Sequence, residues 1–173
     1  MSPIRPVARR AAAAIAALLA LASVAGCASS SDAPYTITDT WVKSADSGMT
    51  AAFGLLTNTT DDPVTIVSAT SPVASKVELH EVVMGDGGAM VMQPKPGGFE
   101  IGPHETLTLE PGGFHIMLMG VKQPIVAGDD VEITLTMDDG STLTFHAIAK
   151  DFAGANENYT GGVAASPSPS AAA

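Results

Sequence analysis

The 173-residue chain is acidic, with eight Lys and Arg against 18 Asp and Glu and a formal net charge of −10. So few cationic side chains exclude a nucleic-acid binder, because phosphates need cationic partners, and an anionic lipid surface would repel the protein. The acidity serves solubility, with a weak attraction of metal cations as the alternative.

The first 26 residues have the pattern of a secretory signal peptide of the lipoprotein type. Three arginines precede an apolar run of sixteen residues, 11–26. This run is short for a membrane span, which needs about 20 residues. It ends in Val24-Ala25-Gly26-Cys27, which resembles the lipobox of bacterial lipoproteins, where cleavage precedes the cysteine and the sulfur receives a diacylglycerol. Cys27 is the only cysteine of the chain, and we expect it to be lipidated.

This anchor would hold the mature protein outside the cytoplasm, on the outer face of the cytoplasmic membrane. An uncleaved anchor helix and a secreted protein with a free thiol are the alternatives. Removal of residues 1–26 would leave five lysines against 18 acids, a net charge of −13. Attachment to the membrane would therefore depend on the lipid.

Composition divides the remainder of the chain into three parts. Residues 27–33 are rich in Ser and Ala and are expected to form a lipidated tether. Residues 153–173 are rich in Gly, Ala, Ser and Pro and are expected to be a disordered tail. Residues 34–152 lie between them and are long enough for one domain with its own core.

The domain is predicted to be all-β, because no helical period lasts for more than a turn. Short apolar or alternating runs are separated by turn clusters such as "NTTDD", "GDGGA" and "PKPGG". This pattern is typical of a β-sandwich or barrel. The predicted strands are residues 35–43, 49–57, 64–69, 77–83, 90–93, 99–101, 106–109, 114–119, 131–137 and a last strand from 143 toward 150.

The strand at 114–119 carries an unusual second row of side chains. Ile116 and Leu118 belong to an apolar row, and the row that alternates with it consists of His115, Met117 and Met119. An ordinary half-buried strand would carry Thr, Lys or Glu in that row. The row therefore suggests a site.

Two more predicted strands offer similar groups on one face. His80 shares a face with Val82 on the strand 77–83, and Met90 shares a face with Met92 on the strand 90–93. If the three strands meet at one end of the sandwich, imidazole and thioether groups would converge on one ion. Soft thioether sulfur favours Cu(I), whereas Mg²⁺ and Ca²⁺ need oxygen and Zn²⁺ prefers thiolate, imidazole or carboxylate. Because a thioether cannot form a disulfide, such a site suits an oxidising compartment.

Other residues of these types are not expected to be ligands. Met84 shares the His80 face and is expected to pack, and Trp41 is expected in the core. His104 and His146 are expected to be solvated. Glu78 could orient an imidazole, but a solvated carboxylate is the expected state.

These residues resemble a known family, the periplasmic copper chaperones called PCu(A)C, over roughly residues 35–149. The likeness includes "AAFGLLTNTTDDPVTIVSATSPVASKVELHE", "MVMQP", "PGGFHIMLMG" and "GDDVEITLTMDDG". Eleven residues separate His80 from Met92 and 22 separate Met92 from His115, each gap one longer than in the family motif, while His115-Ile116-Met117 fits. The extra residues fall in the loops "GDGGA" and "PKPGG", which leaves Met90 open as an alternative to Met92.

The resemblance implies a cupredoxin-like Greek-key β-sandwich or barrel that binds one copper ion. The implied ligands are His80, Met92, His115 and Met117, with Cu(I) as the expected ion and Cu(II) as a second candidate. Met90 and Met119 remain candidates, either as alternative ligands or as residues that contact the ligands. The resemblance also implies delivery of copper toward the binuclear copper centre of cytochrome c oxidase. The partner would be the copper domain of the oxidase or another copper chaperone.

Competing functions are weaker on the sequence. A blue-copper electron carrier needs a Cys thiolate beside two His, and Cys27 belongs to the signal boundary. An enzyme is not expected, because neither G-x-S-x-G nor H-E-x-x-H occurs and no nucleophile with a base is visible. A membrane-tethered copper scavenger or buffer and a metal-free β-sandwich interaction module remain as alternatives.

Overall fold

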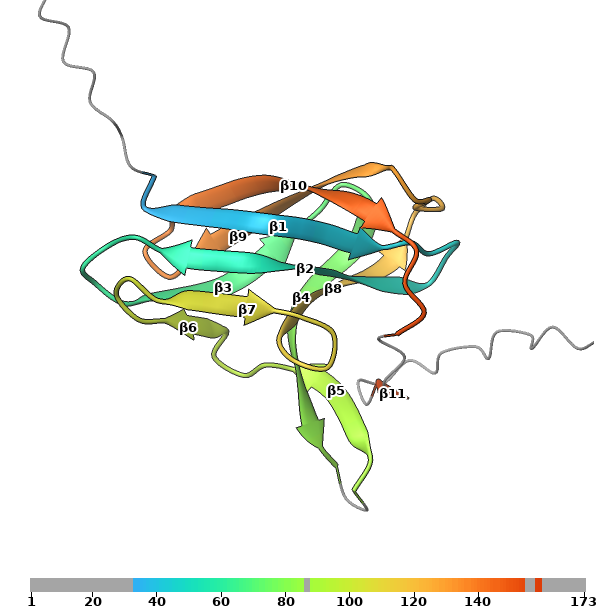
Figure 1. The fold of residues 1–173 in the computed structure, drawn as a ribbon, viewed down its shortest axis with the longest axis horizontal. Coiled ribbons are helices and arrows are strands. Elements are labelled where there is room, and N and C mark those ends of the chain that lie inside the picture. The colour runs from blue at the N-terminus through green and yellow to red at the C-terminus, as the bar shows by residue number, and fades with distance from the viewer. Residues whose placement is uncertain (1–32, 86–87, 155–157, 160–173) are drawn as a thin grey trace, which may run out of the picture. The chain divides into compact units, whose positions relative to one another are not determined.

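The computed structural model describes residues 33–85, 88–154 and 158–159, and the prediction of an all-β domain is confirmed (Figure 1). The predicted signal peptide and Cys27 lie outside the described residues, as do residues 160–173 of the predicted tail. Among the residues that are described, no helix is long and apolar enough to cross a membrane.

Ten strands coincide with the predicted ones, and their ends differ from the prediction by at most three residues. A further strand, β11, lies inside the C-terminal segment whose composition predicts disorder. In chain order the strands are β1 (Tyr35–Lys43), β2 (Met49–Asn58), β3 (Val64–Thr70), β4 (Ala74–Met84), β5 (Met90–Pro94), β6 (Phe99–Ile101), β7 (Thr106–Leu109), β8 (His115–Val121), β9 (Asp130–Met137), β10 (Thr142–Lys150) and β11 (Asn158–Tyr159).

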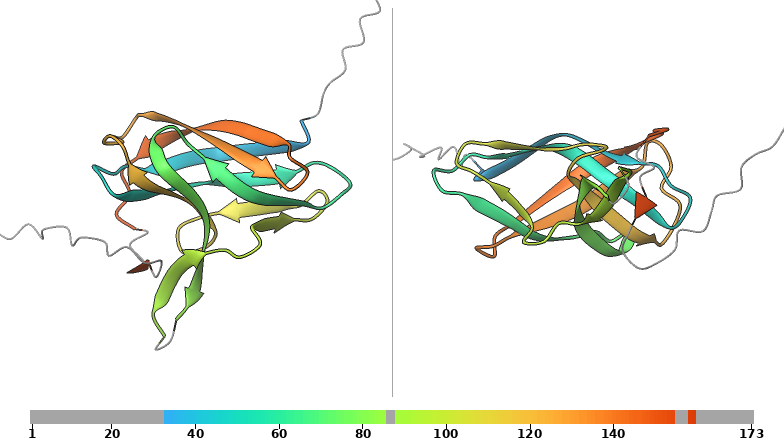
Figure 2. Two further views of the ribbon diagram at one scale, coloured as in Figure 1. Left: turned by 180° about the vertical axis from the view of Figure 1, so that it is seen from behind. Right: turned by 90° about the horizontal axis from the view of Figure 1, so that it is seen from below.

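The described strands are joined in one hydrogen-bonded sheet. Its order is β11-β5-β4-β8-β2-β1-β10-β9-β3-β6, and β7 pairs with β2. Neighbours are antiparallel except for β1 with β10 and β5 with β11. Strands that are distant in this order, such as β4 and β9, contribute to one main core, so the sheet folds over on itself as a sandwich (Figure 2).

The main core follows from simple alternation along the strands. On β9, Val131, Ile133 and Leu135 are buried, whereas Glu132 between them is exposed. Burial of each such aliphatic side chain contributes roughly 1.5–3 kcal/mol. The main core takes up one face of a strand, and the side chains on the other face can therefore serve a binding site.

A β-bulge in β1 changes which residues face the main core. The register shifts by one residue between Thr38, opposite Leu55, and Trp41, opposite Phe53. Asp39, in the bulge, has a positive φ of 53°. The chains approach closely there, since a Cβ on Gly54 would lie 3.1 Å from the Thr38 carbonyl oxygen. The inserted residue turns Trp41 away from the main core.

The strands β4 and β5 extend beyond the sandwich as an arm, where β11 pairs with Val91 and Met92 of β5 (Figure 1, Figure 2). The first half of β4 pairs with β8 as far as His80, and its second half pairs with β5 from His80 to Met84. His80 therefore lies where β4 passes from the sandwich into the arm. We call the paired segments 81–84 and 90–93 the β4–β5 arm.

Candidate metal centre

The unusual row on β8 faces a second cluster of side chains. Ile116 and Leu118 point into the main core, whereas Met117 belongs to a separate cluster on the other face of the sheet. We call this the methionine cluster. Its buried members are Ala51, Phe53, Met92 and Met117, and Trp41, Met49, Val82 and Met119 pack against them.

His80 and His115 lie side by side at the edge of this cluster. They are directly opposite in the β4–β8 register, and their ring centroids are 5.5 Å apart at an interplanar angle of 65°. His80 is 0% exposed and His115 is 4% exposed. Burial of two imidazoles beside apolar side chains costs free energy unless their polar atoms are engaged.

Glu78 orients the ring of His80. The Nε2 atom of His80 donates a hydrogen bond of 2.9 Å to the Glu78 carboxylate, which also forms an ion pair with Lys76. Burial alone would raise the pKa of Glu78, but hydrogen bonds from Lys76 and His80 and the charge of Lys76 outweigh it and lower that pKa. The expectation of a solvated carboxylate at Glu78 is wrong, because its side chain is only 14% exposed. Because Nε2 carries the proton that it donates, the lone pair of the neutral His80 ring is on Nδ1.

The ring of His115 is held by a backbone carbonyl. Its Nδ1 atom donates to the Gly113 oxygen over 3.0 Å. This carbonyl lies in a tight loop, closed by a hydrogen bond from the Glu110 amide to the Phe114 oxygen of 2.8 Å. Neutral His115 therefore has its lone pair on Nε2. In both histidines one nitrogen orients the ring and the other carries a lone pair suited to a metal.

The predicted methionines differ in their placement. Met117 is buried opposite Ala51 on β2. Met92 is buried opposite Val82, which lies two residues beyond His80 on the same face of β4. Met119 is partly buried, whereas Met90 is exposed. Of the two candidates on β5, Met92 is the one that belongs to the cluster. The structure thus brings His80, His115, Met92 and Met117 into one region.

Aromatic rings close one side of this region. Trp41 and Phe53 have ring centroids 4.4 Å apart, and Phe53 lies 6.3 Å from the ring of His115. Phe152, after β10, meets Trp41 edge-on at 5.2 Å, and the Lys150 ammonium lies 5.8 Å from the same ring. Trp41 was expected in the core, but the bulge in β1 places it in the methionine cluster instead. The register shift and the positive φ at Asp39 mark this bulge in the structure, and no sequence pattern signalled it.

The remaining histidines are exposed, as expected. His104 pairs with Asp61 and His146 pairs with Asp130, each over 2.9 Å. Within the described residues, no group of three or more His, Cys, Asp and Glu is placed to hold a metal ion. The candidate centre consists of the imidazoles of His80 and His115 and the thioethers of Met92 and Met117.

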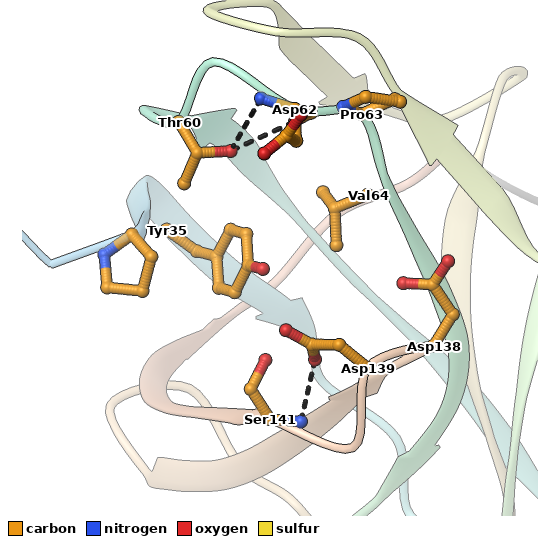
Figure 3. Close-up of a pocket in the computed structure, with 9 residues that line it drawn as sticks. Tyr35, Thr60, Asp62, Pro63, Val64, Asp138, Asp139 and Ser141 are labelled. Atoms are coloured by element: carbon orange, nitrogen blue, oxygen red, sulfur yellow. Dashed lines mark hydrogen bonds between the residues drawn. The ribbon is translucent and has the colours of Figure 1, made fainter.

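A hollow lies around the start of β1, and Figure 3 shows the side chains that line it. Two of its three aspartates have structural hydrogen bonds: the Asp139 carboxylate accepts from the Ser141 amide within the β9–β10 turn over 2.8 Å, and the Asp138 carboxylate accepts from the Thr65 amide of β3 over 3.2 Å. Tyr35 begins β1 and Trp41 lies near its end, so six residues, about 20 Å of strand, separate this hollow from the methionine cluster. We assign the hollow no function.

Comparisons with known proteins agree with this arrangement. The model of a family described as "Putative lipoprotein LpqE-like" matches residues 35–149. The chain belongs to the LpqE-like family. A relative from Leifsonia xyli subsp. xyli, named "Putative lipoprotein Lxx21020", is 50% identical over 125 residues, which are 72% of this chain and 75% of the relative. These names agree with a lipoprotein form of this family member.

Several solved structures share this fold, and PCuAC domains are among them. The copper-bound PCuAC domain from PmoF2 superposes with a TM-score of 0.56 at 18% identity, covering 68% of this chain and 93% of that domain. DR1885 from Deinococcus radiodurans, solved with Cu(I), has a TM-score of 0.53 at 34% identity, covering 68% of this chain and 80% of DR1885. The predicted cupredoxin-like β-sandwich is therefore confirmed.

Proposed function

We propose that this LpqE-like protein is an extracytoplasmic copper chaperone, anchored to the membrane through lipid on Cys27. It binds one Cu(I) through His80, Met92, His115 and Met117 and delivers it to the copper centre of cytochrome c oxidase. The observation that carries the proposal is the pair of buried histidines, 5.5 Å apart, on the face that also holds the methionine cluster. The copper-bound PmoF2 domain and Cu(I)-bound DR1885 support copper as the ion.

The donor set fits a soft monovalent ion. Each histidine is held by an oxygen acceptor, Glu78 for His80 and the Gly113 carbonyl for His115, which leaves a lone pair on the other nitrogen. Thioethers add soft, uncharged donors, which favour Cu(I) over cations that need oxygen. A neutral donor set does not alter the charge of the ion, so the centre remains a cation within an acidic protein.

The weakness of thioether donors would make release possible. A partner with thiolate ligands forms stronger bonds to Cu(I) than Met92 or Met117 does, so copper would pass by ligand exchange through an intermediate with shared ligands. Glu78 keeps the His80 ring in place during this exchange, because its own position is held by Lys76. The lipid anchor would raise the effective concentration of the protein near a membrane-embedded acceptor.

A quadruple substitution tests the site. We combine four substitutions in one variant: His80→Asn, Met92→Leu, His115→Asn and Met117→Leu. This variant should lose tight Cu(I) binding and keep the circular-dichroism spectrum of a folded β protein. Binding is measured by Cu(I) titration against a chromogenic chelator, with Zn²⁺ as the control ion and Met137→Leu, in the main core, as the control variant. Cu(I) binding equal to that of the parent would refute the assigned ligands.

Delivery needs its own experiment. When the Cu(I)-loaded protein is mixed with the apo copper domain of the oxidase, copper should move to that domain. Gel filtration separates the two proteins, and metal analysis of each fraction measures the transfer. Retention of the copper by the chaperone at equilibrium, with the ligands above intact, would support the scavenger or buffer function instead.

A further inference from the structure

Two methionines lie in solvent at the outer end of the β4–β5 arm. Met84 is 74% exposed and Met90 is 46% exposed, and they are directly opposite each other in the β4–β5 register. Met84 was expected to pack, and the structure shows that it does not. Large apolar side chains with this much exposure contribute little to the stability of the fold, so their presence as a pair calls for another reason.

The pairing brings the two side chains together. The amide of Gly85 donates to the Ala89 oxygen over 2.8 Å, which makes Gly85 and Ala89 a hydrogen-bonded pair. In an antiparallel ladder the next pair, Met84 with Met90, is then of the non-hydrogen-bonded kind, whose side chains are closest. Methionine side chains are flexible, so both sulfurs can reach one ion between them.

The pair also continues the row that leads to the candidate metal centre. Met90 and Met92 are two residues apart on β5 and share a face, as do Met84, Val82 and His80 on β4. Two residues of strand correspond to about 7 Å. Thioethers thus extend along one face of the arm from solvent to the buried histidines.

We propose that Met84 and Met90 form a second, surface site for Cu(I), through which copper enters and leaves the buried centre; this rests on the proposed function. The site presents two soft, neutral donors, which suit a weakly held Cu(I) ion. Passage inward is a ligand exchange: bonds from copper to the Met92 sulfur and then to the His80 ring nitrogen form as the bonds to the Met90 and Met84 sulfurs break. The ion stays Cu(I) throughout, so the step needs no oxidant or reductant.

The decisive experiment observes each methionine methyl group. The protein, labelled with [ε-¹³C]methionine, is titrated anaerobically with Cu(I) supplied as its acetonitrile complex. The first equivalent should shift the Met92 and Met117 signals, further Cu(I) should shift Met84 and Met90 together, and Met137, buried in the main core, should not move. Unchanged Met84 and Met90 signals would overturn the surface site and leave this pair as a protein-docking feature. Unchanged Met92 and Met117 signals would instead contradict the proposed function, so the two failures are distinguishable.

A double variant tests the role in transfer. Met84→Leu with Met90→Leu keeps the volume and removes both sulfurs. The first Cu(I) equivalent should bind with affinity unchanged within about twofold, while loading from a Cu(I)–chelator complex in stopped flow slows by at least about threefold, because the local supply of copper is lost. The matched control is Val83→Ile with Val91→Ile, the neighbouring pair on the opposite face of the arm, which should load at the parental rate. A parental rate in the methionine variant would overturn the entry role.

Discussion

The two faces of β8 differ in chemistry although both are buried. Ile116 and Leu118 pack into the main core with aliphatic residues from strands on both sides of the sandwich. His115 and Met117 face the methionine cluster, which is small and rich in sulfur and aromatic rings. One face of the strand thus stabilises the fold, and the other holds donors that a soft metal ion would bind.

This division implies that fold and site respond separately to substitution. The main core is an aliphatic interior, in which lost volume is costly. The methionine cluster contains adaptable side chains, in which a substitution of equal volume should be tolerated while the donor atoms are lost. The following predictions would break or sharpen this contrast.

The largest effect on stability is expected for Leu118→Ala. Leu118 is fully buried in the main core, and the cavity should lower the free energy of unfolding by about 2–5 kcal/mol. Chemical denaturation followed by circular dichroism measures this, and the folded variant should still bind one Cu(I). A loss of copper binding from the folded variant would mean that the two faces are coupled.

The converse is expected for Met117→Leu on the opposite face. The volume is conserved, so stability should change by less than about 1.5 kcal/mol. Cu(I) affinity in the chelator competition should fall by about a hundredfold or more, because a direct donor is removed. Loss of a residue that only holds a ligand in place already costs up to about a hundredfold. Parental affinity would exclude the Met117 sulfur as a ligand.

A smaller effect is expected when the support of His80 is weakened. In Glu78→Gln the charge is lost but an oxygen acceptor remains, so Cu(I) affinity should fall by roughly 10–100-fold. The matched control is Glu81→Gln on the other face of β4, whose carboxylate lies 3.5 Å from Lys95. Equal losses in the two variants would show that general charge, and not orientation of the ring, is responsible.

The smallest effect is expected in the turn between β9 and β10, far from the cluster. Hydrogen bonding from Ser141 lowers the pKa of Asp139 below its ordinary value of 3.8. Because the folded pKa is the lower one, this carboxylate adds stability above pH 3.8 that disappears as the pH falls through the folded pKa. Asp139→Asn should therefore slightly reduce the dependence of unfolding on pH in acid, without changing Cu(I) binding at neutral pH.

Much of the fold was predictable because β-strands have a local period of two. The strand bounds, the two rows on β8 and the face of β4 that carries His80 all follow from alternation in short windows. Trp41 was not predictable. Alternation from Tyr35 and Ile37 would place it in the main core, and a single bulge, seen only when β1 pairs with β2, reverses that assignment.

The sequence by itself determined which side chains share a face of each strand, and the types of donor that this face offers. Only the tertiary structure decided that His80 lies opposite His115, that Met92 and not Met90 reaches the cluster, and that Met84 and Met90 remain in solvent. The physical reason is the separation along the chain of the residues whose contacts decide each feature. Side-chain alternation is set by the backbone within a few residues, whereas strand order, register and the point where β4 leaves β8 depend on contacts between residues far apart in the chain.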